Sequence, residues 1–295
     1  MIGPRLAVLA LLGAAGLVGG IAPGERADAV DRELRVCADP NNLPFSNQQR
    51  QGLENRIAEL VAEELDARLS YTWWAQRRGF IRNTLNAGAC DLVIGVPAGY
   101  ELVETTAAYY RSAYVYVYRA DRGLDLRSMR DPRLRQLRIG VHLIGDDGAN
   151  PPPAHALGRQ GIVDNVVGYM IYGDYREPNP TARIIDAVVA GDIDVAVVWG
   201  PIGGYFARHA SVPLTAVPIT DTAAFAPLRF EFSVAMGVRK GDHALREALD
   251  GILERRREDI EALLDRYGVP RVEAPGAAPG GARPEHQRRS AEGSG

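Results

Sequence analysis

Residues able to carry covalent or acid–base chemistry are few and scattered in this chain of 295 residues. His142, His155 and His209 have no neighbouring carboxylate motif that would make an activated pair. No serine lies in a Gly-x-Ser-x-Gly turn, and no glycine-rich loop has the phosphate-binding pattern. The sequence therefore predicts a protein that is not an enzyme, has no catalytic residues and needs no cofactor.

Metal binding has little support in the sequence. Cys37 and Cys90 are the two cysteines of the chain, whereas a structural zinc site needs four ligands. A set of four polar residues close together in the sequence could suggest a cation site: His142, Asp146, Asp147 and Asn150. Hard cations need several oxygens in one tight loop, and a flexible polar loop is the favoured interpretation of this segment. We predict no metal site.

The segment Trp73–Arg78 is the strongest candidate for a contact surface. Trp74 is followed closely by Gln76, Arg77 and Arg78, and aromatic residues and arginines are enriched where proteins meet partners. The alternative is that one tryptophan faces the core and both arginines are solvated. We predict a binding role for this turn.

The segment Leu34–Phe45 predicts one wall of a binding cleft. An apolar run ends at the Asp39-Pro40 pair and opens into a polar loop ahead of a helix. Loops at the carboxyl ends of parallel strands line the ligand sites of open α/β sheets. The predicted wall residues are Asp39, Asn41, Asn42 and Phe45, with a plain Asx-Pro turn as the alternative. Further residues are assigned to the same cleft: Tyr100, Tyr109, Arg111, His142 and Trp199.

Alternating strands and helices must position these residues. The pattern predicts βαβ units with a parallel sheet and right-handed crossovers. Strands are expected near 34–39, 70–74, 91–96, 105–119, 137–142, 166–172, 194–197, 214–219 and 230–238, and helices near 52–69, 80–86, 154–159, 202–210 and 242–267.

The pattern Leu34–Asp39 returns at Leu137–His142, and Leu85–Ile94 returns at Val188–Val197, with one shared offset in residue number. Two similar α/β lobes are therefore predicted. Lobe 1 would comprise residues 30–119 and 226–272, and lobe 2, inserted between them, residues 120–225. Two strands crossing near Tyr118 and near Phe225 would form a hinge.

The N-terminal segment predicts an exported protein. Arg5, the apolar run Leu6–Ala22 and the small residues up to Ala29 form a signal peptide over residues 1–29, with an uncleaved anchor as the alternative. No later segment is long and apolar enough to span a bilayer, and residues 273–295 are expected to be disordered. An oxidising compartment favours a Cys37–Cys90 disulfide over two buried thiols. The net charge of −3, with no basic face, argues against nucleic acid as a partner.

The two-lobed pattern over Leu34–Pro270 resembles the type II periplasmic solute-binding proteins that bind polar amino acids. Four segments are similar to the quinoprotein-dehydrogenase-associated binding proteins of the MoxJ/XoxJ family, encoded beside methanol dehydrogenases: Leu34–Asn47, Tyr71–Leu85, Cys90–Tyr100 and Tyr109–Ser112.

This chain departs from the amino-acid receptors at their charge-binding positions. The arginine that binds an α-carboxylate would fall near Gly99, where no arginine is close, and the acid that binds the ammonium is replaced by Trp199. Their Gly-Thr helix start is replaced by Gly145–Pro153. An unpaired buried charge costs several kcal/mol, so free amino acids are not the expected ligands.

The resemblance implies a non-catalytic periplasmic accessory protein. Its partner would be a PQQ-dependent alcohol dehydrogenase containing calcium or a lanthanide, or the cytochrome c of that enzyme. An open, aromatic-lined cleft would receive a polypeptide segment of this partner during its maturation or activation. The alternative is a solute receptor that delivers a small non-amino-acid ligand to an ABC importer.

Overall fold

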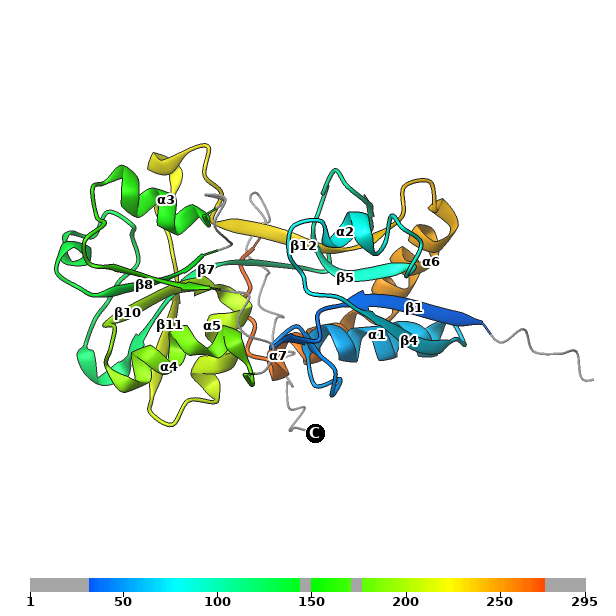
Figure 1. The fold of residues 1–295 in the computed structure, drawn as a ribbon, viewed down its shortest axis with the longest axis horizontal. Helices are drawn as coiled ribbons and strands as arrows, with labels where there is room; N and C mark the ends of the chain where they lie inside the picture. The colour runs from blue at the N-terminus through cyan, green and yellow to red at the C-terminus, as the bar shows by residue number, and fades with distance from the viewer. Residues whose placement is uncertain (1–31, 144–149, 171–176, 274–295) are drawn as a thin grey trace, which may run out of the picture. The chain divides into compact units, whose positions relative to one another are not determined.

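The computed structural model describes residues 32–143, 150–170 and 177–273. Its main sheet has the strand order β4-β1-β5-β12-β7-β10-β8-β9, with β6 paired to β12 and β11 paired to β7. Lobe 1 denotes here the part with β1–β6, α1, α2, α6, α7 and most of β12, and lobe 2 the part with β8–β11 and α3–α5 (Figure 1). The lobe 1 elements are β1 (Glu33–Ala38), β2 (Asn41–Asn42), β3 (Ser46–Asn47), α1 (Leu53–Glu64), β4 (Arg68–Trp73), α2 (Phe80–Asn83), β5 (Leu92–Pro97), β6 (Glu104–Thr105), β12 (Glu231–Val238), α6 (His243–Arg255) and α7 (Arg257–Arg266).

Helix α1 follows directly from its sequence. Asn55, three residues after the N-cap Gly52, accepts a hydrogen bond from the Gly52 amide at 3.1 Å, which is the half of a capping box that a glycine N-cap allows. Leu53, Ile57 and Val61 recur at helical spacing and are buried against the sheet. The helix ends at Glu64 rather than at the predicted residue 69, because Arg68 already belongs to β4.

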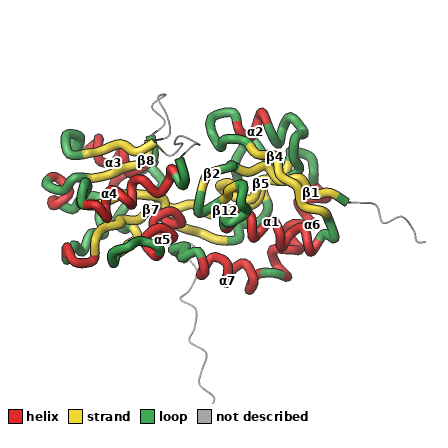
Figure 2. The backbone as a smooth tube through the Cα atoms, turned by 60° about the horizontal axis from the view of Figure 1, so that its bottom comes forward, coloured by secondary structure: helices red, strands yellow, loops and turns green. Residues whose placement is uncertain are grey.

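The two faces of the lobe 1 sheet are covered by different helices, as Figures 1 and 2 show. Leu92 and Ile94 of β5 pack into the core shared with α1, α6 and α7. Val93 and Val96 point to the opposite face, where α2 covers them with Phe80. Leu92, Val93 and Ile94 follow the two-residue period of a strand, and the register shift in the β12–β5 pairing brings Val96 to the face of Val93.

Lobe 2 repeats the same layered construction. Its elements are β8 (Ile139–Leu143), α3 (Pro152–Arg159), β9 (Val166–Met170), η3 (Pro180–Ala182), α4 (Arg183–Ala190), β10 (Val195–Trp199), α5 (Gly200–Arg208) and β11 (Leu214–Pro218). Val195 and Val197 of β10 face the core beside α3, and Ala196 and Val198 face the core beside α4.

Strands β7 (Tyr110–Arg119) and β12 connect the lobes. The first residues of β7 pair with β12, with Tyr110 opposite Val234, and its later residues pair with β10 and β11. The predicted α/β, two-lobed fold with strands crossing between the lobes is confirmed. The predicted lobe boundaries in residue number stay a prediction.

The single helix predicted over 242–267 is wrong, because the chain forms two helices, α6 and α7, which meet at Arg256. Arg255 and Arg256 both donate to the carboxylate of Glu64, at 2.9 and 3.1 Å. Neighbouring residues on a straight α-helix point about 100° apart. The shared carboxylate therefore accompanies a bend at this position.

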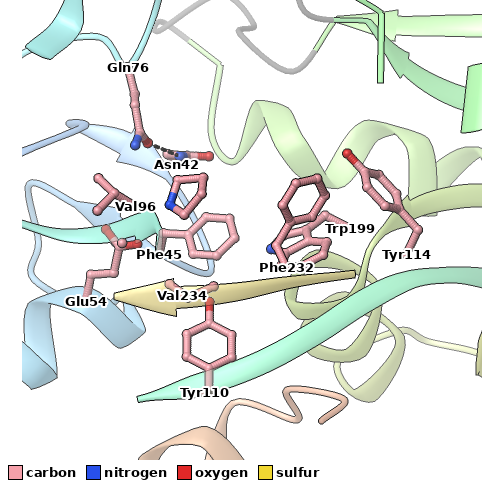
Figure 3. Close-up of a pocket in the computed structure, with 12 residues that line it drawn as sticks. Asn42, Phe45, Glu54, Gln76, Val96, Tyr110, Tyr114, Trp199, Phe232 and Val234 are labelled. Carbon is pink, nitrogen blue, oxygen red and sulfur yellow. Dashed lines mark hydrogen bonds between the residues drawn. The ribbon is translucent and has the colours of Figure 1, made fainter. Parts of the chain in front are cut away.

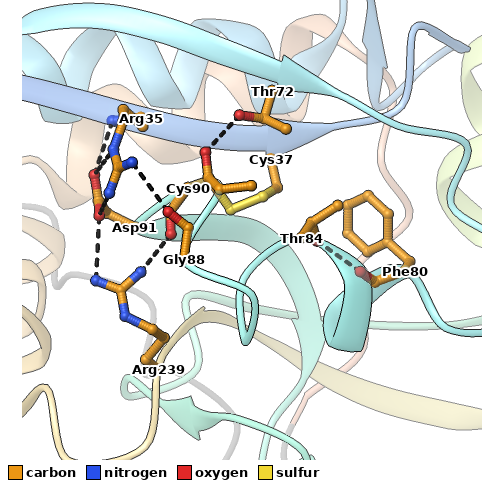
Figure 4. Close-up of a disulfide and its surroundings, with 10 residues drawn as sticks. Arg35, Cys37, Thr72, Phe80, Thr84, Gly88, Cys90, Asp91 and Arg239 are labelled. Atoms are coloured by element: carbon orange, nitrogen blue, oxygen red, sulfur yellow. Dashed lines mark hydrogen bonds and ion pairs between the residues drawn. A yellow bond between two sulfur atoms is a disulfide. The ribbon is translucent and has the colours of Figure 1, made fainter.

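The predicted disulfide between Cys37 and Cys90 is confirmed, with the two Cα atoms 5.5 Å apart (Figure 4). It joins the end of β1 to Cys90, two residues before β5 begins. Beside it, the Asp91 carboxylate accepts hydrogen bonds from Arg35 at 2.6 Å and from Arg239 at 3.2 Å. Covalent and ionic links therefore fix the same strand junction.

Several predictions fall outside the described residues. These are the signal peptide over 1–29, the tail from 274 onward, and the loop residues Asp146 and Asp147. Within the described ranges, no helix combines the length and the apolar character needed to cross a bilayer.

Candidate functional site

A cavity of about 290 Å³ lies where the two crossing strands meet the loops of lobe 1 (Figure 3). Its wall combines the loops after β1 and β4, the first turn of α1, the end of β5, and residues of β7, β10 and β12. The lining residues are Asn42, Phe45, Glu54, Gln76, Gly95, Val96, Pro97, Tyr110, Tyr114, Trp199, Phe232 and Val234.

Aromatic rings form one end of the cavity. Trp199 is directly opposite Tyr114 in the β10–β7 ladder, and their ring centroids are 5.5 Å apart. Trp199 also meets Phe232 of β12 at 5.7 Å, and both contacts are edge-to-face. Such arrangements add to the stability that burial itself supplies, so this end is a rigid apolar wall.

The loop side of the cavity is held by Asp39. Its carboxylate accepts hydrogen bonds from the amides of Asn41 at 2.9 Å and Gln76 at 2.7 Å. The side chains of Asn42 and Gln76 then bond to each other at 3.1 Å across the cavity rim. Asp39 is buried and orders two separate loops, so it positions the lining residues without lining the cavity itself.

Glu54 brings a carboxylate into this apolar setting from the first turn of α1. Burial, with a smaller contribution from the negative charge of Asp39, raises the pKa of the Glu54 carboxyl to about 7. Room for the carboxylate exists because residue 95 is glycine: a Cβ at Gly95 would overlap with Oε1 of Glu54. The absence of a side chain at residue 95 therefore makes the space in which the Glu54 carboxylate lies.

The lobes touch beside the cavity. Asn41 of lobe 1 donates to the Glu177 carbonyl at 2.8 Å, and the Thr181 hydroxyl donates to the Leu43 carbonyl at 2.5 Å. Across the hinge, Arg208 of α5 donates to the Asp265 carbonyl at 2.7 Å. The lobes are thus in direct contact at both places.

The comparison with known sequences agrees with this architecture. Residues 34–270 match the bacterial extracellular solute-binding proteins, family 3. The chain belongs to this family.

Three relatives within this type of protein are similar to the chain over most of its length. Protein MoxJ of Methylorubrum extorquens is 34% identical over 249 residues, which cover 80% of this chain and 81% of MoxJ. The crystal structure of the periplasmic binding protein XoxJ from Methylobacterium extorquens is 37% identical, with a TM-score of 0.67 over 82% of this chain and 100% of XoxJ. MxaJ from Methlophaga aminisulfidivorans is 27% identical, with a TM-score of 0.70 over 81% of this chain and 100% of MxaJ.

Several of the residues predicted for the cleft come together in this family 3 protein. Asn42, Phe45, Gln76 and Trp199 line the cavity. Asn41 lies in a neighbouring groove together with Glu177. Their roles toward a ligand stay predictions.

Other predicted residues lie outside the cavity. Tyr100 and Arg111 line a separate groove of about 540 Å³, where Arg111 pairs with Glu231 at 2.7 Å. Tyr109 lines another groove, beside α6 and α7, and its hydroxyl donates to the Ile94 carbonyl at 3.2 Å. His142 is buried, and its pKa is lowered to about 4 by burial, against a smaller opposing effect of a backbone hydrogen bond with Thr181.

The predicted contact turn is exposed at Trp74, and it contributes Gln76 to the lining of the cavity. Trp74 follows β4 and is 47% exposed. Arg77 and Arg78 make interactions of their own within the chain and do not line the cavity. Gln76 therefore belongs to both the turn and the cavity rim, whereas Trp74 forms an exposed surface beside them.

Sequence reasoning missed four lining side chains: Glu54, Tyr110, Tyr114 and Phe232. The alternation of tyrosines in β7 contains part of the signal, since Tyr110 and Tyr114 share one strand face. In the described parts of the chain, no group of three or more His, Cys, Asp or Glu residues is arranged to hold a metal ion.

Proposed function

We propose that this chain is a non-catalytic periplasmic accessory protein of a PQQ-dependent methanol or alcohol dehydrogenase. It would be exported through the signal peptide predicted at residues 1–29 and would assist maturation or activation of the enzyme or of its cytochrome c. Support comes from the similarity to MoxJ and XoxJ over about four fifths of the chain, together with the association that the sequence resemblance implies.

The lining of the cavity carries the proposal. A receptor for a free amino acid must pair both an ammonium and a carboxylate, because an unpaired buried charge costs several kcal/mol. Aromatic and apolar side chains dominate this lining, which among the described residues contains a single acidic residue and no arginine. The site therefore lacks the means to hold a zwitterion, which argues for a role other than amino-acid uptake.

The exposed turn at Trp74 is the proposed contact with the dehydrogenase. Large, exposed aromatic residues tend to dominate the energy of protein interfaces. Purified mature protein, with its disulfide intact, should form a complex with the dehydrogenase or its cytochrome in analytical ultracentrifugation. Trp74→Ala should weaken this complex roughly tenfold or more.

Val163→Ala is the matched control, since Val163 is also exposed, at 62%, but lies in lobe 2. It should leave the affinity unchanged. Absence of any complex with either purified protein would contradict the accessory function. Equal weakening by both substitutions would contradict the placement of the contact at Trp74.

A solute receptor for a small non-amino-acid ligand is the second candidate. The observation that favours it is a cavity of ligand size beside direct hydrogen bonds between the lobes. In that case a solute should raise the melting temperature and reduce the radius of gyration, while no dehydrogenase binds.

A further inference from the structure

The Glu54 carboxylate is the starting point. Among the described residues, no side chain or amide donates a hydrogen bond to it and no cation pairs with it. The charged group that affects it most, Asp39, is itself acidic. Glu54 is partly buried, and its carboxylate faces the largely apolar cavity, where a negative charge is less well solvated than in bulk water. This end of the cavity therefore favours a positive charge beside the carboxylate.

The nearby cations do not supply that charge. Arg111 and Arg229 line the neighbouring groove, and Arg111 is already paired with Glu231. The amides of Asn42 and Gln76 at the rim are bonded to each other. Among the residues that the structure describes, none supplies a positive charge to Glu54, which leaves that place to a bound molecule.

The rest of the lining decides what kind of cation fits. A metal ion needs several oxygen ligands, whereas this cavity offers one carboxylate among the rings of Phe45, Tyr110 and Trp199. Faces of aromatic rings attract ammonium groups, with Trp the strongest and Tyr next. Figure 3 shows Glu54 beside Phe45, with Trp199 and its neighbouring rings toward the other end of the cavity.

We propose that this cavity binds an alkylammonium group, with Glu54 as counter-ion and the aromatic rings as the surrounding cage. The inference rests on the proposed binding role of the cleft, but it does not require the dehydrogenase. The ligand should carry no anionic group, because no arginine lines the cavity. A volume of about 290 Å³ limits it to a small amine or to the end of a lysine side chain.

The direct test uses n-butylammonium and tetramethylammonium as probes, titrated at pH 8 by isothermal calorimetry. 1-Butanol and butyrate are the neutral and anionic controls. Both cations should bind, and Glu54→Gln should weaken them roughly 10- to 100-fold, as expected for losing a charged partner. Glu59→Gln, an exposed acid on the same helix paired with Arg56, is the matched variant and should bind like the unchanged protein.

A second readout is the pH dependence for tetramethylammonium, which does not titrate. Its affinity should rise as pH increases through about 7, because the Glu54 carboxyl ionises there. Among the described residues, Asp39, Tyr109 and Tyr110 are the titratable groups coupled to Glu54. Burial raises the pKa of both tyrosines, so they stay neutral in this range.

The two sources of an alkylammonium group are separated by competition. If saturating dehydrogenase abolishes n-butylammonium binding, a lysine of the partner fills the cavity; if it does not, the ligand is a free amine. Equal binding of 1-butanol, or unchanged cation binding by Glu54→Gln, would overturn the proposal. A dehydrogenase complex that forms although the cations do not bind would refute this inference alone, and cation binding without a complex would refute only the accessory function.

Discussion

Glu54 has a measurable effect on the stability of the empty protein. Its carboxyl has a pKa of about 7 when folded and about 4.5 when unfolded. The folded state therefore holds a proton that the unfolded state loses between these values, and stability falls as pH rises through this window. The full difference is on the order of 3 kcal/mol above pH 7.

Glu54→Gln should therefore stabilise the unliganded protein at pH 8 and change it little below pH 4.5. Urea unfolding at both pH values measures the two free energies of unfolding. Glu59→Gln should show no such pH dependence. The same gain at both pH values would contradict an ionisation effect.

His142 should act in the opposite direction. Its pKa is about 4 when folded, mainly because of burial, against an ordinary value of 6.5. The unfolded state takes up the proton first, so stability is lost as pH falls from 6.5 toward 4, by roughly 3 kcal/mol in all.

His142→Asn should flatten this acid limb, whatever its effect at neutral pH. Unfolding free energies measured from pH 7 down to 4 give the slope directly. His155→Asn, at an exposed position, serves as the control and should keep the slope of the unchanged protein. An unaltered slope in His142→Asn would assign the acid sensitivity elsewhere.

At the scale of elements, the disulfide is the strongest local constraint on lobe 1. It closes a loop of 53 residues between β1 and β5. In the chain-entropy account, such a link is worth about 4 kcal/mol. Cys37→Ala with Cys90→Ala should lower the urea midpoint accordingly, and reduction of the unchanged protein should have a similar effect. A midpoint that neither treatment moves would contradict this account.

Helices and strands could be predicted where one hydrophobic pattern dominated the local sequence. They could not be predicted where contacts with distant residues decided where an element ends. The longer strands follow from apolar and aromatic runs, whereas the two-residue strands β2, β3 and β6 consist mainly of polar residues and carry no such signal. The bend between α6 and α7 was missed, because it involves Glu64, a residue almost two hundred positions away in sequence. Helix α1 was extended too far, because Leu65 and Leu69 continue its apolar spacing although the chain has already turned.

The lining residues of the cavity also divide into those that the sequence could predict and those that it could not. Phe45 and Trp199 could be assigned, because the ends of parallel strands mark ligand sites. The choice of Tyr109 over Tyr110 failed to find the lining residue, since only the register of Tyr110 opposite Val234 decides which tyrosine faces the cavity. The place of Glu54 in the cavity lining could not be predicted, because an acidic residue in the first turn of a helix is ordinarily explained by its favourable interaction with the helix dipole.

At the scale of the whole molecule, contact between the lobes depends on few hydrogen bonds. The Thr181 hydroxyl is buried and donates to the Leu43 carbonyl. Thr181→Val keeps the shape but leaves that carbonyl unpaired, which costs about 1–3 kcal/mol. Small-angle scattering should then show a larger radius of gyration.

Thr215→Val makes the same chemical change on β11, where no hydrogen bond of the side chain is lost, and should leave the radius unchanged. An identical radius in Thr181→Val would show that this bond does not hold the lobes together.

The position of β12 between β5 and β7 also sets the order in which the two lobes can complete their sheets during synthesis. Strands β8–β11 all lie within residues 139–218, so lobe 2 can be completed soon after they are synthesised. The strands β1, β4 and β5 are made earlier, yet their sheet must wait for residues 231–238. The segment that follows α7 comes later still, and its Pro270 and Val272 bond to β7 through Ser112 and Arg111. Lobe 1, which is synthesised first, therefore completes its sheet last. Until β12 is available, the edge of β5 that will pair with it stays unpaired, and a chaperone would need to shield it.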